Sequence, residues 1–500
     1  MMKSTVRTII LVAASVFAAI SCQKEAAVSE PQNSVKAGET IQVNINASLG
    51  DLVAADGTKA TAESVVRLKW AEGDKVQAYC GTTKISTEEG LTVTPSDNKM
   101  FAKLSGAITT AGLTSGTSVI TFVYSSGCTV ATDGLTFDFS NQTTTNGIPF
   151  VAYATLVYDG TATLTDKMVE FKFATSVMKI AATNLGGGDI TNATISGINT
   201  KVTLTPSASG DPTINENTAG NIVTTNIAAS SDKTRAIITV GLVPDNNTGR
   251  NITVTQTGYT NKGVITKTTI ESNKSYTTPA SLFTCGTLGS GVTAHDYVLI
   301  AGTKWATRNI GATEDTGTES YGTYFAWGDV TGQEASPKTG TSPIANAFTN
   351  GFSSGTYSYS DNPLQLPLEK DAAYKKWGSS WRMPTSAEFL ALTEATFWKW
   401  DDTDKGYYVY APQSGDAGKT DSDSGITGTY NKSDALLFFP AAGNGNGTSL
   451  NNAGSRGLYW SSSLSADTEL AYGLGSSSSY VNPQGLNYRY YGYSVRPVSD

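Results

Sequence analysis

Between residues 41 and 280, hydrophobic and polar residues alternate in short runs that are separated by turn-forming clusters. Such runs include "IQVNINA" (41–47), "LTFDFS" (135–140), "VEFKF" (169–173) and "NITVTQTG" (251–258). Alternation gives a strand one hydrophobic and one polar face, and clusters such as "NLGGGD" and "PDNNTG" predict turns. The segment 235–256 predicts two strands joined by a turn. With no convincing helix pattern, this region predicts two consecutive β-sandwiches, residues 41–178 and 179–284.

The pattern changes near residue 285, where aromatic residues become frequent. Seven of the eight tryptophans and 17 of the 23 tyrosines lie beyond this point. Here "LPLEKDAAYKKWG" (366–378) predicts a short helix, because its hydrophobic residues share one face and Gly378 ends it. A second helix is predicted over "PTSAEFLALTEATFW" (384–398), where Thr385 and Glu388 form a capping box.

Five strands are predicted around these two helices. They are "YVLIA" (297–301), "TYFAW" (323–327), "ALLFFPAAG" (435–443), "LYWSSS" (458–463) and "YSVRPV" (493–498). Two helices within mainly antiparallel strands and long loops make an α+β domain. The sequence therefore predicts a multidomain chain in which two all-β sandwiches precede an α+β domain of residues 285–500, called the head below.

The first 22 residues have the features of a secretory signal. The apolar run "IILVAASVFAAI" (9–20) is shorter than the roughly 20 apolar residues that a membrane-spanning helix needs. It leads into "AISC" (19–22), which resembles the lipobox of bacterial lipoproteins, where cleavage leaves Cys22 as the lipid-bearing N-terminus. That resemblance implies a protein anchored by lipid in the outer membrane and exposed at the cell surface. The polar residues 23–40 are predicted to form a flexible tether.

Tyrosines gather near the end of the chain. Segment 464–493 mixes serine, glycine, asparagine and tyrosine, a composition typical of antibody recognition loops. A tyrosine ring gives rigid contact area while its hydroxyl stays in water. We therefore expect a binding face here, although one or two of the rings could instead pack into the fold. The candidate ligand-binding residues are Tyr472, Tyr480, Asn482, Asn487, Tyr488, Tyr490, Tyr491 and Tyr493.

A segment near the N-terminus, "GTKATAESVVRLKWAEGDKVQAY" (57–79), is similar to the opening of the fimbrillin-like proteins of Bacteroidetes. Trp70, Gly73, Asp74 and Lys75 carry the match. The resemblance implies a two-sandwich pilin or pilin-like surface protein. In that family a lipid-anchored precursor is clipped after a basic residue and assembled by donated strands. This makes Arg67 the candidate processing site and other pilins candidate partners.

The C-terminal region resembles a second group, the Fibrobacter succinogenes major paralogous domain. Six blocks occur in the family's order: "GTKWATRNIGA" (302–312), "YGTYFAWGD" (321–329), "WGSSWRMPTSAEF" (377–389), "LFFPAAGNGNG" (437–447), "GSRGLYWSSS" (454–463) and "YGYSVRPV" (491–498). The resemblance implies a C-type-lectin-like fold related to the formylglycine-generating enzymes. It says little about the ligand.

Candidate catalytic and metal-binding groups are few. His295 is the only histidine, and the adjacent Asp296 is poorly placed to orient its imidazole. The enzymatic relatives of the second fold use paired cysteines, which the sequence after Cys285 lacks. The acidic segments 400–406 and 421–425 could suggest calcium, but neither has a full ligand set. We expect no enzyme activity, no metal and no cofactor.

Cysteine number and net charge exclude further classes. Cys80, Cys128 and Cys285 are too few and too far apart for a disulfide framework, although a Cys80–Cys128 bridge stays open. The net charge of −8 without a basic cluster argues against nucleic acid as a partner.

These features predict a lipid-anchored surface protein that acts as an adhesin or ligand-binding protein through its head. Its partner would be an extracellular glycan or protein, and a place at a pilus tip is compatible with this role. The alternative is a structural fimbrial subunit or cap with no ligand of its own. A polymerising pilin donates a free C-terminal strand, whereas "SVRPVSD" (494–500) is predicted to belong to the head's core. A carbohydrate-active enzyme ranks third, since no motif selects the required pair of carboxylates.

Overall fold

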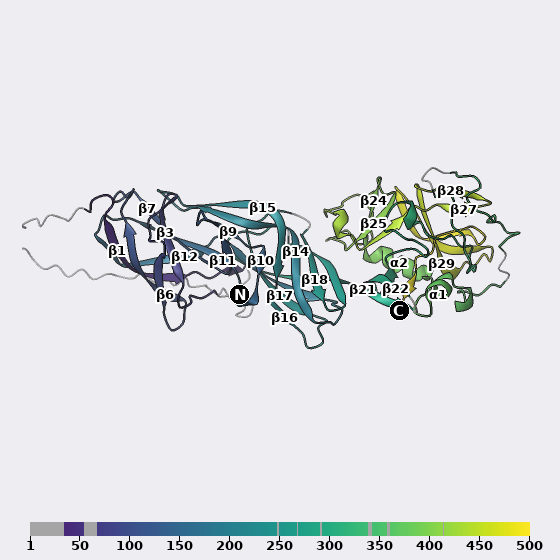
Figure 1. The fold of residues 1–500 in the computed structure, drawn as a ribbon, viewed down its shortest axis with the longest axis horizontal. Coiled ribbons are helices and arrows are strands. Elements are labelled where there is room, and N and C mark those ends of the chain that lie inside the picture. The colour runs from purple at the N-terminus through teal and green to yellow at the C-terminus, as the bar shows by residue number, and fades with distance from the viewer. Residues whose placement is uncertain are drawn as a thin grey trace, which may run out of the picture.

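The structure is a computed structural model that describes residues 35–54, 68–247, 250–267, 269–290, 293–338, 343–357, 361–413 and 415–500. These residues form several β-sheets and two short α-helices, so the chain is mostly β, as predicted. Figure 1 shows an elongated molecule with the first sheets at one end and the head at the other. Among the described residues, none of the helices has the length and hydrophobicity that a membrane span requires.

The first sandwich is an eight-stranded sheet that curls on itself, because β3 pairs with both β5 and β7. Its central strand β1 alternates buried and exposed residues, as the sequence pattern predicted. Its strands are β1 (Thr40–Leu49), β3 (Lys75–Cys80), β4 (Thr83–Lys84), β5 (Leu91–Pro95), β6 (Phe101–Thr109), β7 (Val119–Ser126), β11 (Phe150–Val157) and β12 (Thr163–Phe173).

The "WAEGD" residues close the core of this sandwich. Trp70 is buried and stacks on Tyr124 with ring centroids 4.5 Å apart. Gly73 has a φ of 87°, a backbone conformation that favours glycine. Asp74 accepts hydrogen bonds from the backbone N–H of Ala71 (2.7 Å) and from the Tyr124 hydroxyl. In this motif Trp70 therefore fills the core, and the following turn is stabilised by the Asp74 carboxylate.

The second sandwich packs a five-stranded sheet against one face of an eleven-stranded sheet, and one core contains residues of both. The five strands are β2 (Val53–Ala54), β13 (Ser176–Thr183), β16 (Ile227–Ala229), β17 (Ala236–Leu242) and β20 (Lys274–Ser281). The larger sheet contributes β8 (Thr129–Val130), β9 (Thr136–Asp138), β10 (Asn141–Gln142), β14 (Ile190–Thr205), β15 (Thr213–Thr224), β18 (Arg250–Gln256) and β19 (Tyr259–Ile265).

Strand pairing crosses the boundary expected between the two sandwiches. β2 pairs with β20, β9 pairs with β14, and β10 pairs with β15. Residues 129–142 fall within the predicted first sandwich, yet Phe137 and Phe139 are buried in the second core. The strands predicted in 235–256 do form, as β17 and β18, but they lie in different sheets and are not a hairpin.

The larger sheet also continues into the head. β19 pairs with β21 (Phe283–Ser290), which pairs in turn with β22 (Thr293–Ile300), β23 (Thr303–Ala306) and finally β32 (Val498–Ser499). Val264, Phe283 and Cys285 pack against the head's core, and Lys262 Nζ donates to the carbonyl of Ala435 (3.3 Å). The predicted boundary at residue 285 therefore lies inside a continuous sheet.

The rest of the head consists of small antiparallel sheets, two α-helices and long loops. The sheets are formed by β24 (Phe397–Asp401), β25 (Gly406–Tyr410) and β26 (Leu437–Pro440), by β27 (Asn444–Asn446) and β28 (Ser449–Asn451), and by β29 (Arg456–Leu464), β30 (Leu470–Ser477) and β31 (Tyr480–Tyr488). Four short 3-10 helices are described: Thr144–Asn146, Thr318–Ser320, Leu368–Lys370 and Lys432–Asp434. The predicted strand 323–327 is wrong, because that segment makes only isolated bridges, from Tyr324 to Gln333 and from Phe325 to Tyr493. The predicted strand 493–498 is wrong for the same reason, except at Val498, where β32 begins.

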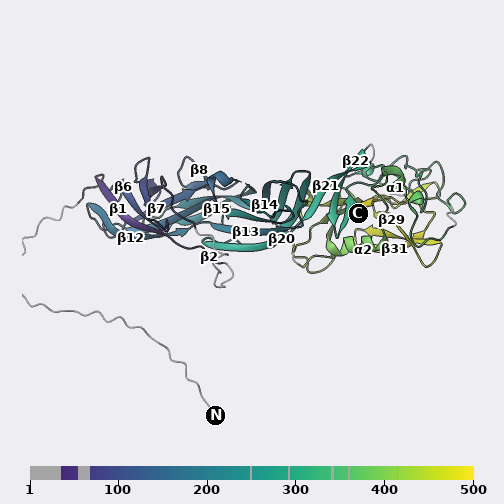
Figure 2. The same ribbon diagram turned by 90° about the horizontal axis from the view of Figure 1, so that it is seen from below.

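Both predicted helices form, but over shorter ranges than predicted, because Leu368–Lys370 is a separate 3-10 helix and Phe397 and Trp398 belong to β24. α1 (Ala372–Trp377) begins after Asp371, whose carboxylate accepts from the backbone N–H groups of Ala373 and Tyr374, and ends at Gly378. α2 (Ser386–Ala395) begins with the predicted capping box of Thr385 and Glu388. Figure 2 shows α2 beside β31, and Phe389 and Leu392 share a core with residues of β29 and β30.

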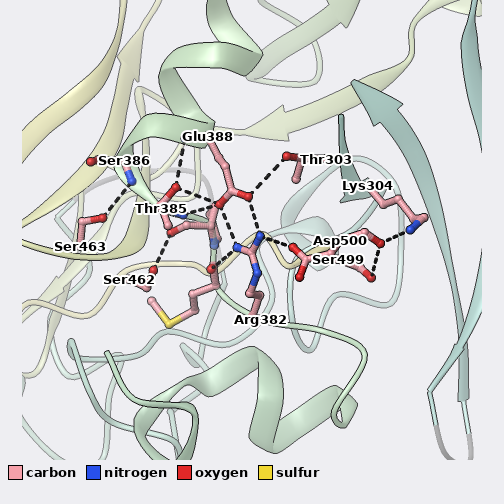
Figure 3. A network of polar contacts seen from close by, with 12 residues as sticks. Thr303, Lys304, Arg382, Thr385, Ser386, Glu388, Ser462, Ser463, Ser499 and Asp500 are labelled. Atoms are coloured by element: carbon pink, nitrogen blue, oxygen red, sulfur yellow. Dashed lines mark hydrogen bonds and ion pairs between the residues drawn. The ribbon is translucent and has the colours of Figure 1, made fainter. Parts of the chain in front are cut away.

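An ion-pair network fixes the start of α2 to the last residues of the chain (Figure 3). Arg382 contacts Glu388 (2.6 Å) and Asp500 (2.5 Å). The backbones of Arg382 and Val498 exchange two hydrogen bonds of 2.8 and 2.9 Å. Lys304 of β23 donates to the backbone carbonyl of Asp500. Residues 498–500 are therefore engaged within the head.

Three of the six blocks of the second resemblance, 302–312, 437–447 and 491–498, meet in the head's interior, where Arg496 is buried. Its guanidinium donates to Asn309 Oδ1 (2.8 Å) and lies 4.3 Å from the ring centroid of Phe439. Three backbone carbonyls, those of Ala306, Thr307 and Phe438, accept the remaining bonds at 2.7–3.1 Å. Burial lowers the pKa of Arg496 to about 10, so it remains protonated at neutral pH.

Candidate functional site

The candidate binding residues come from the hairpin of β30 and β31 and from the turn that follows it. β31 is an edge strand, paired only with β30 in its sheet. Its residues alternate between exposed and half-buried along the whole strand. Pro483 lies within this strand and has no N–H to offer a further strand. The exposed side chains, rather than the strand edge, are therefore the available contact surface.

A β-bulge divides β31 into two parts. Gly473 pairs with Gly485 and Gly475 pairs with Asn482, so Pro483 and Gln484 together face one residue of β30. Beyond the bulge, Leu486 lies opposite Tyr472. Since Tyr472 and Gly475 are three residues apart on β30, the side chains of Leu486 and Asn482 belong to opposite faces of the hairpin.

A series of aromatic rings leads from the head's core to the surface. Trp460, fully buried, stacks on Tyr493 with centroids 4.3 Å apart. Tyr493 contacts Tyr491 at 6.3 Å, and Tyr491 contacts Tyr490 at 4.9 Å. Tyr490 stacks on Tyr488 at 5.5 Å. The last ring is 44% exposed, so the series ends in solvent.

Tyr493 was predicted as a binding residue, and the structure contradicts this. Its side chain is 2% exposed, and burial raises the pKa of its hydroxyl far above the usual value. In β31 the even-numbered residues are the exposed ones, so residue 493 would not be exposed even if the alternation continued. The backbone also turns at 488–491, where the N–H of Tyr491 donates to the carbonyl of Tyr488 (3.0 Å). Tyr493 supports the exposed rings from beneath.

The other predicted residues form two separate groups. Tyr472, Tyr488, Tyr490 and Tyr491 lie at one end of the hairpin, where Tyr472, Tyr490 and Tyr491 are half-buried and Tyr488 is exposed. Tyr480 and Asn482 are exposed but lie before the bulge, and Asn487 is half-buried. We call Tyr472, Leu486, Tyr488, Tyr490 and Tyr491 the tyrosine patch. Leu486, which is 46% exposed, was missed because it is the only aliphatic residue among them.

Arg489, also missed, holds the patch in place. Its guanidinium lies 4.6 Å from the ring centroid of Trp327 and donates to the carbonyl of Thr468 (2.8 Å), to Asn362 Oδ1 (3.1 Å) and to the carbonyl of Asp361 (3.0 Å). The side chain therefore points into the fold between two tyrosines that point out. The sequence signal for this inward side chain was the position of Arg489 between Tyr488 and Tyr490, in a segment where exposed and half-buried residues alternate.

His295 and the cysteines lie in packed surroundings. The His295 ring stacks on Trp377 with centroids 3.5 Å apart, and burial lowers the pKa of its imidazole. Asp296 instead accepts a hydrogen bond from the Thr287 hydroxyl (2.6 Å). Cys80, Cys128 and Cys285 are free. Burial raises the pKa of Cys128 to about 12 and that of Cys285 to about 11, so neither thiol is activated as a nucleophile.

The acidic segments considered for calcium make internal contacts. Lys432 Nζ lies 2.5 Å from Asp404 Oδ2 and 3.4 Å from Asp401 Oδ2. Asp423 Oδ2 accepts from the backbone N–H of Thr420 (2.7 Å). Within the described residues, no group of three or more His, Cys, Asp or Glu side chains is placed to hold a metal ion. Cys22 and Arg67 lie outside the described residues.

No family model and no curated protein matches the chain. Among solved structures, a protein proposed to act in cell adhesion from Bacteroides uniformis is 16% identical, with a TM-score of 0.29 over 51% of this chain and 96% of that chain. A similar protein from Bacteroides ovatus is 13% identical, with a TM-score of 0.28 over 47% and 90%. The tip fimbrial protein Mfa3 from Porphyromonas gingivalis is 10% identical, with a TM-score of 0.26 over 52% and 99%. At TM-scores this low, the likeness carries no further conclusion.

Proposed function

We propose that this protein is a cell-surface adhesin or ligand-binding protein that contacts its ligand through the tyrosine patch of its head, without catalysis. One observation carries the proposal: a continuous series of ring contacts connects the buried Trp460 to the exposed Tyr488. Exposed tyrosines that are held rigidly lose little conformational entropy on binding, and for this reason they are frequent at the centres of interfaces.

Array binding by variants tests the proposal. The whole chain is applied to an array of extracellular glycans and proteins, beside the double variant Tyr488→Ala/Tyr490→Ala. Signals that depend on the patch should fall about thirtyfold or more in the double variant. Phe101→Ala is the matched control, because Phe101 is 49% exposed on the first sandwich. Equal signals from parent and double variant would exclude the patch as the binding site.

A structural fimbrial subunit is the second candidate, favoured by the position of β1. This strand lies between β6 and β12 and buries Ile41, Val43 and Ile45 in the first core. Cleavage after Arg67 would leave β1 and β2 attached to the rest of the molecule by pairing and packing alone. A donated strand of similar pattern could then replace β1. Mass spectrometry of protein isolated from cells, searched for a chain beginning at Leu68, tests this processing.

The lipid anchor at Cys22 and the location in the outer membrane are part of the same proposal. The variant Cys22→Ser should leave the membrane fraction and lose metabolic labelling by fatty acid. An unchanged distribution between membrane and soluble fractions would contradict the anchor.

A further inference from the structure

The charges around the tyrosine patch restrict the class of ligand that it can bind. This inference rests on the proposed function and adds the chemistry of the partner. The patch itself contributes four tyrosine rings and one leucine and no charged group. Its basic neighbour in the sequence, Arg489, is directed inward onto Trp327 and three oxygen acceptors. No cation of this segment therefore faces the ligand.

Three exposed acidic residues, Asp361, Asp467 and Glu469, lie in the two segments that hydrogen-bond to Arg489, the residue between Tyr488 and Tyr490. The backbone of Glu469 accepts a hydrogen bond from Arg489 N–H (3.1 Å), and that of Asp361 accepts from the Arg489 guanidinium (3.0 Å). Asp467 occupies the same turn and accepts from the backbone N–H of Glu469 (3.1 Å). These bonds fix the backbones of Glu469 and Asp361 and the carboxylate of Asp467 in the segments that contact Arg489.

Aromatic rings and carboxylates together select positively charged groups. A lysine or arginine side chain gains cation–π attraction over a tyrosine ring, most strongly when water is excluded. Carboxylates at the border of an interface raise the association rate of a basic partner and oppose an acidic one. Tyrosines surrounded by serine, glycine and asparagine are also typical of surfaces that bind proteins.

We propose that the tyrosine patch binds a protein segment bearing exposed lysine or arginine side chains. The rings of Tyr488 and Tyr490 receive the cationic side chains and their aliphatic stems. Leu486 and Tyr472 supply the adjoining apolar contact, and the carboxylate border pairs with flanking basic residues. Anionic glycans and acidic proteins are excluded by the same border.

A random peptide library displayed on phage tests the proposal with the whole chain immobilised. Peptides that the parent retains should be rich in lysine and arginine, and their affinity should fall about thirtyfold with Tyr488→Ala/Tyr490→Ala. Glu469→Lys should weaken them about tenfold at about 50 mM salt, and less at about 500 mM. The control Glu72→Lys makes the same change in net charge on the first sandwich, where Glu72 is exposed, and should have little effect.

The outcomes separate this inference from the proposed function. Selected peptides without basic residues, or peptides equally sensitive to Glu469→Lys and Glu72→Lys, would overturn the basic ligand. Glycan signals on the array that disappear in the tyrosine double variant would also overturn it, while leaving the patch as the binding site. If neither peptides nor array signals depend on Tyr488 and Tyr490, both proposals fail. Thermal melts of each variant confirm that the head is folded in every comparison.

Discussion

Arg382 forms a two-point ion pair with Glu388, with Nη1 2.8 Å from Oε2 and Nη2 2.6 Å from Oε1. The same Glu388 caps α2 by accepting the backbone N–H of Thr385 (2.7 Å). Arg382 also pairs by its backbone with Val498. The Glu388 carboxylate therefore links the start of α2, through Arg382, to β32 (Figure 3).

The variant Glu388→Gln should destabilise the head by about 1–3 kcal/mol, the usual range for a hydrogen-bonded charge. Burial by itself raises the pKa of Glu388, but the bonds from Arg382 and Thr385 outweigh it, so the pKa is lowered overall. Stability gained from a lowered carboxyl pKa is present above the unfolded value, about 4.3, and is lost as the pH falls through the folded value.

The difference in melting temperature between parent and Glu388→Gln should thus be largest at pH 7 and should shrink as the pH falls below about 4. Tryptophan fluorescence reports on the head, which contains seven of the eight tryptophans. Glu394→Gln, on an exposed position of the same helix, is the control and should melt like the parent. A constant difference across this pH range would mean that the ion pair contributes no stability.

Replacing Arg496 should lower the free energy of unfolding of the head more than any change at an exposed arginine. Arg496→Met leaves Asn309 Oδ1 and three carbonyls without their donor, at a cost of at least about 3 kcal/mol. Arg496→Lys keeps the charge, but an ammonium cannot reach acceptors placed for a planar fork, so it should also destabilise. Arg308→Lys, in the sequence block that contains Asn309 but with its side chain 42% exposed, should stay within about 0.5 kcal/mol. Chemical denaturation followed by tryptophan fluorescence measures the series.

Local signals in the sequence predicted local structure well. The capping box at Thr385 and Glu388 involves residues three apart, and the alternation of β1 is visible within ten residues. Segment 323–327 has the composition of a strand but lacks a partner along its length, and pairing depends on residues far away in the chain. The continuous sheet from β19 to β32 could not be predicted for the same reason.

In the candidate site too, local features could be predicted from the sequence and long-range ones could not. Composition identified the tyrosine-rich segment, but the bulge at Pro483 and the turn at 488–491 decide which rings face solvent. Both depend on the register with β30 rather than on residue type. Arg489 points inward because its guanidinium contacts Trp327 and the 361–362 loop. These partners are distant in sequence, and no residue within 464–493 indicates where they lie.

The isolated fragment 285–500 should fold, but with lower stability than the head has in the whole chain. The fragment contains nearly all of the head's aromatic core. It lacks β19, which pairs with β21, and Phe283, the first residue of β21, which packs against the head's core. We expect one cooperative transition at a lower melting temperature, and fragment 250–500 should recover part of the loss. A featureless melt of 285–500 would mean that the head cannot fold without the second sandwich.

Thermal melts can separate surface tyrosines from structural aromatics before any ligand is known. Tyr488→Ala should change the free energy of unfolding by no more than about 0.5 kcal/mol, because the ring is exposed and surface substitutions are usually this small. Trp460→Ala and Tyr493→Ala should each cost about 3–5 kcal/mol, because both rings are buried and stacked on each other.

Tyr491→Ala should fall between these limits, since its ring is half-buried and contacts both Tyr490 and Tyr493. Tryptophan fluorescence is again the measurement, with Phe101→Ala as a control for the loss of an exposed ring elsewhere. If Tyr488→Ala lowers the stability as much as Trp460→Ala does, the exposed end of the ring series is part of the scaffold. The rings of the tyrosine patch would then be needed for the stability of the head rather than for ligand binding. The proposed binding face would have to lie elsewhere on the head.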